Sequence, residues 1–354
     1  MIFQAKITKG ALWRPFFVAL LLAGPAAADP VRVATWNPGL MRDGPGLLLR
    51  DIARGDAQVT AAATVIAAVA PDVIVLTGFD WDYDGRALAA FGDVLAAQGH
   101  DMPHRFAGPP NTGVPTGRDM DRDGRLGRAR DAQGYGRFRG QAGMAVLSRL
   151  PLGPVTDYSA MLWRDMPGSR IPDDMPGADI QRLSTTAHWD VPVLTPNGPL
   201  HLLVLSATPP AFEPRNIPRN HDEITFWLAH LPDAPFAVVG NLNLDPVDGD
   251  GDPAALTALL SVTQDPAPRG AWQPVQDGPN VGHRGDPAQD TAEYARAPGN
   301  LRLDYILPSR GARVTDSGVV WPAPDDPLAP AVAAASHRRL VWVDLYPEND
   351  AIAP

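Results

Sequence analysis

Two amide side chains stand directly after an apolar run in the second half of the chain. Residues 236–240 are apolar or glycine, and Asn241, Asn243 and Asp245 follow at alternate positions. Polar residues at the end of a strand often form a site, because the backbone stops pairing there and the side chains face a crevice. Amide oxygens can ligate a hard metal ion, but a neutral amide cannot take a proton from water. The segment therefore predicts a site without a general base at Asn241.

Three aspartates at alternate positions form a second group that could do chemistry. Asp119, Asp121 and Asp123 are followed by Gly124, and this pattern is the first half of a calcium-binding loop. The acidic residue expected near the twelfth position of such a loop is missing, because Arg130 stands there. Two interpretations stay open, a calcium site and a solvated loop in which arginines balance the aspartates.

Periodic segments of the chain must position these groups. Strands are predicted at 31–36, 72–76, 143–148, 183–188, 200–205, 236–240, 301–307, near Val319 and at 340–345, and helices at 57–69, at 86–98 and from Asn220 or its neighbours through Trp227. A long loop rich in Gly, Pro, Asp and Arg is predicted at about 100–140, within a single domain at 29–354. The order of these elements predicts an α+β fold in which a pair of mixed sheets is sandwiched by helices.

A polar run precedes the apolar face of the third predicted helix. The run is Asn220-His221-Asp222-Glu223, and we expect it to cap the helix rather than to ligate a metal. His188 and His201 lie in strand patterns and are expected to be packed or edge histidines.

Several landmarks in this order resemble a known superfamily. They are Thr35-Trp36-Asn37, residues 72–80, residues 143–148, residues 203–210, Gly240-Asn241-Leu242-Asn243, Arg302-Leu303-Asp304-Tyr305 and residues 336–341. Together they resemble the endonuclease/exonuclease/phosphatase superfamily, metal-dependent phosphodiesterases related to pancreatic-type deoxyribonuclease and inositol polyphosphate phosphatases. The resemblance spans Val31 to Leu345 and implies a four-layer αββα sandwich with the active site at one end of the paired sheets. It also implies oxygen ligands for Mg²⁺, a carboxylate that activates water, and imidazoles near the phosphate.

The resemblance assigns roles to four positions that match the family. Asn37 matches the first-strand Asn that helps to arrange metal and phosphate, and Asn243 matches the second polar residue of the Gly-Asp-x-Asn motif. Asp304 and Tyr305 match the Leu-Asp-Tyr strand, for which the resemblance implies a mostly structural role.

The remaining family positions are substituted. Gly78 stands where the family has its metal-binding Glu, and Asn241 stands where the motif has Asp. Ser206 takes the place of a His, and in the last motif, usually Ser-Asp-His-Arg, His337 replaces Asp and Arg338 replaces His. A divalent ion loses much of its binding energy when carboxylates become neutral or cationic groups, and an arginine stays protonated and cannot act as a base. The substitutions predict that the hydrolytic machinery is largely dismantled.

Two hypotheses for function follow from these residues. The first is an inactive or strongly impaired family member that binds a small phosphate-bearing ligand, a metal or a protein partner through the crevice of the family's former active site. The alternative is a Mg²⁺- or Ca²⁺-dependent phosphodiesterase or phosphatase with a rearranged site. Its metal ligands would be Asn37 and Asp80, since Asp80 lies two residues after Gly78 and points to the same face in extended backbone, with Asp82 as a further candidate. A loop or bulge would then have to turn His337 into the site.

The first 28 residues have the pattern of a secretory signal. Lys6, Lys9 and Arg14 precede an apolar core at 16–23, and three alanines at 26–28 precede Asp29. The apolar core is too short to span a bilayer, and a chain without cysteine forms no disulfides in an oxidising compartment. We therefore expect an exported protein, periplasmic or secreted.

The net charge bears on the kind of partner. The formal charge of −10 becomes −13 when the three cations of the signal are removed. Such an acidic chain repels a polyphosphate backbone, so the charge disfavours duplex nucleic acid as a ligand.

Overall fold

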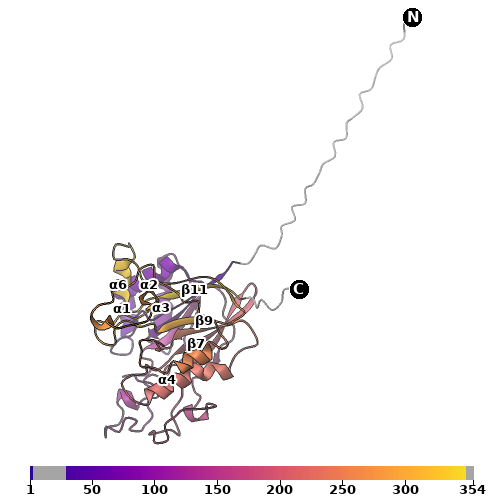
Figure 1. The fold of residues 1–354 in the computed structure, drawn as a ribbon. Coiled ribbons are helices and arrows are strands. Elements are labelled where there is room, and N and C mark those ends of the chain that lie inside the picture. The colour runs from indigo at the N-terminus through magenta and orange to yellow at the C-terminus, as the bar shows by residue number, and fades with distance from the viewer. Residues whose placement is uncertain (3–28, 348–354) are drawn as a thin grey trace.

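The protein folds into two mixed β-sheets that pack face to face, with helices on both outer faces (Figure 1). The computed structural model describes residues 1–2 and 29–347, so the predicted signal at 1–28 falls almost wholly outside the described residues. No helix in the described part of the chain is long and apolar enough to cross a membrane.

The first sheet has six strands in the order β10-β11-β1-β2-β4-β3. Their bounds are β1 Val31–Trp36, β2 Val73–Phe79, β3 His104–Phe106, β4 Gly143–Ser148, β10 Arg313–Val319 and β11 Val341–Tyr346. β1 and β2 are parallel, and the other pairs are antiparallel.

The second sheet has five strands in the order β5-β6-β7-β8-β9. Their bounds are β5 Thr156–Asp157, β6 His188–Thr195, β7 Gly198–Ser206, β8 Phe236–Asn241 and β9 Asp304–Pro308. β7 and β8 are parallel, so Ser206 and Asn241 end their strands side by side in register.

Helices form the two outer layers. They are α1 Leu47–Ala53, α2 Ala57–Val69, α3 Arg86–Ala97, α4 Asn216–Thr225, α5 Ala254–Leu259 and α6 Ala329–Ala335. Short 3-10 helices lie at Ala129–Asp131, Trp163–Asp165, Phe226–Ala229, Gly278–Asn280 and Pro287–Gln289. In Figure 1, α1, α2, α3 and α6 lie on the side of the first sheet, and α4 lies on the opposite side, near β7.

Alternation along the central strands explains the layers. Val73 and Val75 of β2 point between the sheets, whereas Ile74 and Leu76 pack beneath the helices of the first sheet. β7 repeats the pattern, since its alternate residues contribute to the core between the sheets and to the core under α4 and α5. The sequence of a strand that is buried on both faces is a continuous apolar run. The predicted α+β four-layer sandwich is confirmed.

Two predicted elements are placed differently in the structure. The strand predicted at 183–188 is irregular, and the strand β6 begins only at His188. The backbone before β6 is bonded to side chains of α4 instead of a neighbouring strand: Leu183 O accepts from Arg219 Nε, and Thr185 N donates to the Glu223 carboxylate.

The predicted cap of the third helix was also wrong. α4 begins at Asn216, so Asn220 and its successors lie inside the helix. Asn220, Asp222 and Glu223 are buried and face the irregular segments around α4. His188, in contrast, is packed as expected, with ring nitrogens bonded to Ser184 Oγ and Glu223 O.

Candidate functional site

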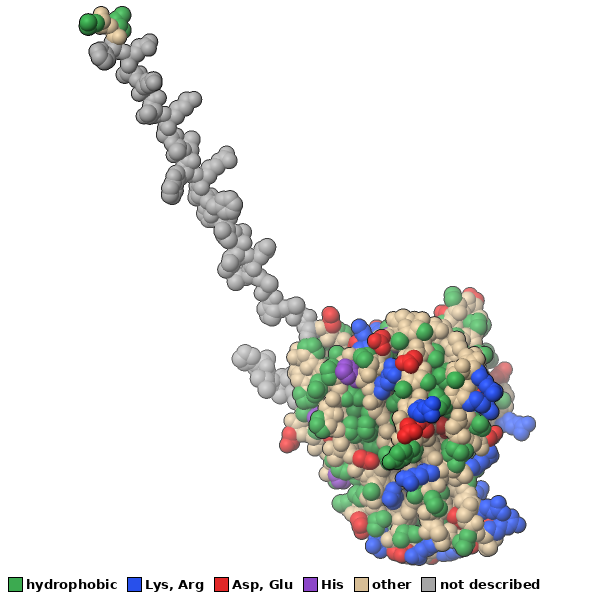
Figure 2. Space-filling model, turned by 180° about the vertical axis from the view of Figure 1, so that it is seen from behind, with side chains coloured by type: hydrophobic (Ala, Val, Ile, Leu, Met, Phe, Trp, Pro, Cys, Tyr) green, Lys and Arg blue, Asp and Glu red, His purple; other side chains and the backbone are tan. Residues whose placement is uncertain are grey.

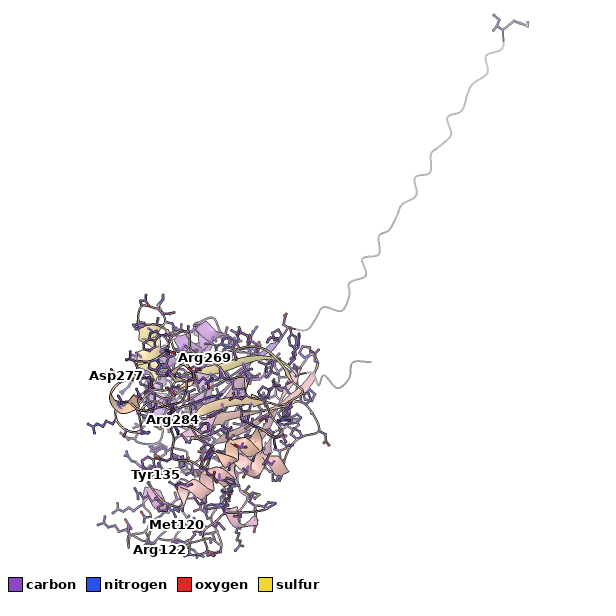
Figure 3. All side chains as sticks on the ribbon, viewed as in Figure 1. Met120, Arg122, Tyr135, Arg269, Asp277 and Arg284 are labelled. Atoms are coloured by element: carbon purple, nitrogen blue, oxygen red, sulfur yellow. The ribbon has the colours of Figure 1, made fainter. Side chains whose placement is uncertain are left out.

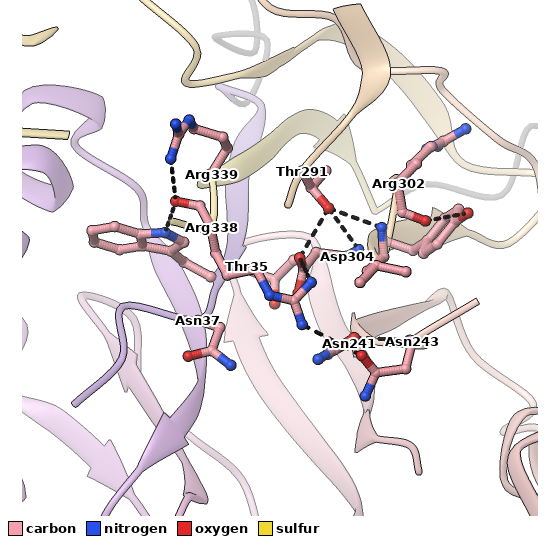
Figure 4. Close-up of polar contacts among 12 residues, drawn as sticks. Thr35, Asn37, Asn241, Asn243, Thr291, Arg302, Asp304, Arg338 and Arg339 are labelled. Carbon is pink, nitrogen blue, oxygen red and sulfur yellow. Dashed lines mark hydrogen bonds and ion pairs between the residues drawn. The ribbon is translucent and has the colours of Figure 1, made fainter. Parts of the chain in front are cut away.

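Five strands have an end at one edge of the sandwich, and we call this region of strand ends the crevice. Asn37 follows β1, and Gly78 is the penultimate residue of β2. Ser206 and Asn241 are the last residues of β7 and β8. β9 runs antiparallel to β8 and begins there with Asp304, which is paired in register with Asn241. Because parallel strands end at the same edge, the topology collects polar side chains from both sheets (Figure 4).

A local turn fixes the amides of Asn241, the last residue of β8, and of Asn243, two residues later. Asn241 Oδ1 accepts a hydrogen bond of 2.8 Å from the backbone N–H of Asn243. Asn243 adopts a left-handed φ of 49°, and its Nδ2 donates to Ala207 O at 2.7 Å. Asn tolerates this backbone conformation better than most residues, so its type is explained by the turn as well as by any ligand. Asn243 remains partly exposed, whereas Asn241 is buried.

A buried ion pair lies between the two sheets at the crevice. Arg338 Nη1 is 3.2 Å from Asp304 Oδ2, and both side chains are almost fully buried. Arg338 also points to Asn243, with 3.4 Å between Nη2 and Oδ1. Thr291 Oγ1 donates to the same Asp304 oxygen at 2.9 Å. In Figure 4 the Arg338 guanidinium lies amid Asp304 and the two amides of β8.

Burial and the neighbouring groups act on the Asp304 carboxyl in opposite directions. Burial raises the pKa of Asp304, while Arg338 and the Thr291 hydroxyl oppose that rise. Asp304 Oδ1 has no hydrogen-bond partner among the described residues. Asp304 therefore lies in the crevice as one half of a buried ion pair, and the mostly structural role that the resemblance implies for it stays a prediction. A charged residue at the head of an apolar strand was the signal in the sequence, because a buried carboxylate needs a partner.

Gly78 and Asn37 lie where the resemblance implies a metal-binding glutamate. Gly78 has a φ of 64° within a β-bulge of β2 opposite β4. A Cβ atom added there would lie 2.3 Å from Asn37 Oδ1. The Asn37 amide thus fills the space that a longer side chain at 78 would need. Its Oδ1 accepts from the backbone N–H of Gly39 at 3.0 Å.

Asp80 and Asp82, the acids proposed for a rearranged metal site, accept hydrogen bonds from backbone N–H groups. Asp80 is buried, and its two oxygens accept from Arg42 N at 2.7 Å and Ala142 N at 2.9 Å. Burial raises the pKa of Asp80, although these two N–H groups oppose the rise. Asp82 accepts from two backbone N–H groups at the start of α3. Both carboxylates are thus committed to joining loops and capping a helix.

The remaining candidates occupy different surroundings. Ser206 is partly exposed at the end of β7, beside Asn241. His337 is exposed, and its ring packs at 5.5 Å from that of Tyr294. The His337 imidazole is therefore not turned into the crevice by a bulge. The neighbouring Arg338 reaches Asp304 instead. The crevice therefore holds three amides, a hydroxyl and one ion pair.

The aspartates of the long loop form a separate cluster. One carboxylate oxygen from each of Asp119, Asp121 and Asp123 lies within 4.8 Å of the others. Asp119 also accepts from the backbone N–H groups of Asp123 and Gly124. In Figure 3 the neighbouring Met120 and Arg122 lie at the lower end of the molecule, away from Arg269 and Asp277. The expectation of calcium here remains a prediction.

Comparisons with known proteins identify the fold and the family. The sequence model of the Endonuclease/Exonuclease/phosphatase family matches residues 35–342. An endonuclease/exonuclease/phosphatase from Beutenbergia cavernae DSM 12333 is 20% identical, with a TM-score of 0.54 over 90% of this chain and 72% of that one. A family protein from Leptotrichia buccalis C-1013-b is 13% identical, with a TM-score of 0.54 over 89% and 99% of the two chains. The enzyme from Bacteroides vulgatus is 10% identical, with a TM-score of 0.50 over 91% and 100%. No curated protein matches the sequence.

Proposed function

Because the chain belongs to the endonuclease/exonuclease/phosphatase family, we propose that it is a binding member that holds a ligand in the family crevice without hydrolysing it. The observation that carries the proposal is the buried pair of Arg338 and Asp304. At the position where the family has an imidazole, this chain has a guanidinium that is neutralised by a carboxylate. An arginine cannot accept a proton from water, so the group cannot serve as a base.

The donor set does not fit the divalent metal of the family. Mg²⁺ is usually held by one or two carboxylates and several waters in octahedral geometry. The crevice offers Asn37, Asn243 and Ser206, which are neutral, and its carboxylate at Asp304 is paired with Arg338. Placing a dication beside this pair would bring it close to a guanidinium with the same sign of charge. The family metal is therefore not expected to bind here.

A small phosphate-bearing ligand suits the polar groups that remain accessible. Asn37, Ser206 and Asn243 are all partly exposed at the edge of the two sheets. An amide N–H and a hydroxyl donate to phosphate oxygens, and the Arg338 guanidinium lies behind Asn243. On the face shown in Figure 2, acidic and basic side chains are interspersed, without the broad basic surface that duplex nucleic acid needs.

The competing hypothesis is a phosphodiesterase with a rearranged metal site. It needs Asp80 to ligate an ion, and both Asp80 oxygens already accept backbone hydrogen bonds. A change in the loops at Arg42 and Ala142 would have to precede binding. The geometry thus favours the binding protein, and activity assays discriminate between the two.

The test combines turnover with binding on the same purified protein. We expect no hydrolysis of bis(p-nitrophenyl) phosphate or p-nitrophenyl phosphate above background with Mg²⁺, Mn²⁺ or Ca²⁺. Calorimetry with glycerol 3-phosphate is expected to detect binding that Asn37→Ala and Ser206→Ala weaken several-fold. Gln98→Ala serves as the control, because this amide is exposed at the end of α3. Metal-dependent turnover that is abolished by Asp80→Ala would refute the proposal.

Two further expectations are separable from the crevice. We propose that residues 1–28 direct export and are removed, which mass spectrometry of the protein recovered from the periplasm or medium would test by finding a chain that starts at Asp29. Calcium binding at the loop is tested by calorimetry with Ca²⁺ and the variant Asp121→Asn. Binding with Kd in the millimolar range or tighter suits an exported protein, and equal heats for both proteins would exclude this loop as the site.

A further inference from the structure

A cavity of about 210 Å³ opens beside the crevice, where the chain leaves β2. Its lining residues include Trp81, Tyr83 and Phe138 together with Asp80, Asp82 and Asp84. One part of the lining, residues 80–84, begins two residues after Gly78. A cavity of this size is smaller than the sites that enclose drug-sized molecules, so it suits a single chemical group.

Two aromatic residues of the lining, Trp81 and Tyr83, contact each other and are at least partly exposed. Trp81 and Tyr83 meet edge to face, with 6.3 Å between ring centroids and an interplanar angle of 81°. The Trp81 indole N–H is used, since it donates to Ala107 O at 3.3 Å. Tyr83 is 90% exposed, which is unusual for a tyrosine that forms part of a cavity wall.

Elsewhere the protein covers aromatic faces with its own arginines. Among the described residues, five guanidinium groups lie over rings, for example Arg339 at 4.4 Å from the centroid of Trp321 and Arg32 at 4.2 Å from that of Trp342. Within residues 29–347 no Arg lies over Trp81, Tyr83 or Phe138 in this way. This group of rings therefore lacks the cation that others in the same molecule have.

The charges of the lining favour a cation as the occupant. Three aspartates stand against one arginine, Arg86. Asp80 and Asp82 accept backbone hydrogen bonds with both oxygens, so they supply negative potential but not a free set of ligands for a small metal ion. Asp84 is exposed. The aspartates would repel an anion, and a neutral apolar group would gain no electrostatic attraction from them.

We propose that this cavity binds the ammonium group of a small organic cation, with the rings of Trp81 and Tyr83 against the alkylated nitrogen and Asp84 as the nearest free counter-charge. Ring faces attract cations through their quadrupole, and an alkylated ammonium loses little hydration when it enters an aromatic site. The inference does not rest on what the crevice binds, so the failure of either proposal leaves the other intact.

The test compares choline with its neutral isostere, 3,3-dimethyl-1-butanol. Calorimetry at low ionic strength should give choline a Kd on the order of millimolar, and the neutral isostere should bind at least several-fold more weakly. Raising the salt concentration should weaken choline binding, because an exposed carboxylate is screened.

Variants of exposed residues test the site without disturbing the core. Tyr83→Ala should weaken choline binding about two- to five-fold. Asp84→Asn should weaken it about two-fold, whereas Arg86→Gln should strengthen it, because one change removes an attractive charge and the other a repulsive one. Tyr135→Ala is the control, since Tyr135 is an exposed ring outside the cavity.

The location is read independently by NMR. Choline should shift one indole N–H signal in particular, and that signal should be the one that disappears in Trp81→Phe. Equal affinities for choline and the alcohol, unchanged binding in Tyr83→Ala, or no detectable choline binding up to about 100 mM would each overturn the proposal.

Discussion

Helix α4 and the crevice both bury charged side chains, but they use them differently. In α4, Arg219 donates to the backbone oxygens of Leu183, Arg182 and Gln133, and Glu223 accepts from Thr185 N and Thr208 N. In the crevice, Arg338 and Asp304 bond to each other and to side chains, and Asp304 Oδ1 has no partner among the described residues.

The two regions therefore differ in what their buried charges bind: those of α4 bond backbone groups and support the fold, whereas those of the crevice bond each other and nearby side chains. Around α4 the long irregular segment before β6 has few strand partners, so side chains satisfy its backbone groups. Asn220 extends this role, because its Nδ2 donates to Thr208 O and Leu242 O beneath the amides of β8. The charged side chains of α4 hold the backbone of the neighbouring irregular segments in place. Those of the crevice lie beside partly exposed groups that a ligand can reach.

The largest expected effect comes from breaking the α4 side of this comparison. Glu223→Ala leaves the N–H groups of Thr185 and Thr208 buried without acceptors, and we expect it to lower the free energy of unfolding by about 4 kcal/mol. Glu223→Gln keeps one acceptor and should cost about half as much. Urea unfolding measures both, with the exposed Asp174→Asn as control. A loss below about 1 kcal/mol in Glu223→Ala would show that the segment is held by other contacts.

Breaking the crevice pair should cost somewhat less, and the cost should be recoverable. Arg338→Leu leaves Asp304 buried and unpaired, with an expected loss of about 3 kcal/mol. The double variant Arg338→Leu/Asp304→Asn removes both charges and should return to within about 1 kcal/mol of the starting protein. A double-mutant cycle in urea gives the coupling energy. Additive losses would mean that the pair is not a unit.

A pH dependence should reveal a third buried acid next to the crevice. Asp290 is 7% exposed and precedes Thr291, and burial together with Asp245 and Asp248 raises its pKa to about 7. A carboxyl whose pKa is raised on folding keeps its proton in the folded state and loses it in the unfolded state. Stability contributed by this proton is therefore lost as the pH rises from the unfolded pKa of about 4 towards 7.

The measurement compares unfolding at pH 5 and pH 8. This single group should lower the free energy of unfolding by about 2 to 3 kcal/mol across that interval. Asp290→Asn removes the titration, so the variant should lose that much less stability over the same interval than the starting protein. An identical pH profile for the two proteins would show that Asp290 does not titrate there.

The sequence predicted the layers well and parts of the site poorly, for physical reasons. Strands such as β2 are buried on both faces, so they appear as apolar runs that periodicity detects. The inward polar face of α4 was misread, because a polar run looks the same whether it meets solvent or an irregular segment of the chain. The pairing of Asp304 with Arg338 was not predicted, because the two residues lie 34 positions apart in the sequence. The spacing of the motifs could not show that contact.

The smallest expected effect concerns Gly78, and it decides whether the lost carboxylate can be restored. Gly78→Ala meets both a left-handed φ of 64° and the Asn37 amide, so it should cost about 2 kcal/mol. Gly55→Ala is the matched control: its φ is 68° with nothing near its Cβ position, and the backbone alone should cost about 1 kcal/mol.

In the Asn37→Ala background the clash disappears, so Gly78→Ala should then cost no more than Gly55→Ala. Urea unfolding of the starting protein, Gly78→Ala, Asn37→Ala, the double variant of these two and Gly55→Ala provides the comparison. If the cost of Gly78→Ala is the same with and without Asn37, the amide does not fill that space. The expected dependence means that a glutamate at 78 and the present position of Asn37 exclude each other. Restoring the metal ligand would then require moving the one amide of the first strand that the family pattern retains.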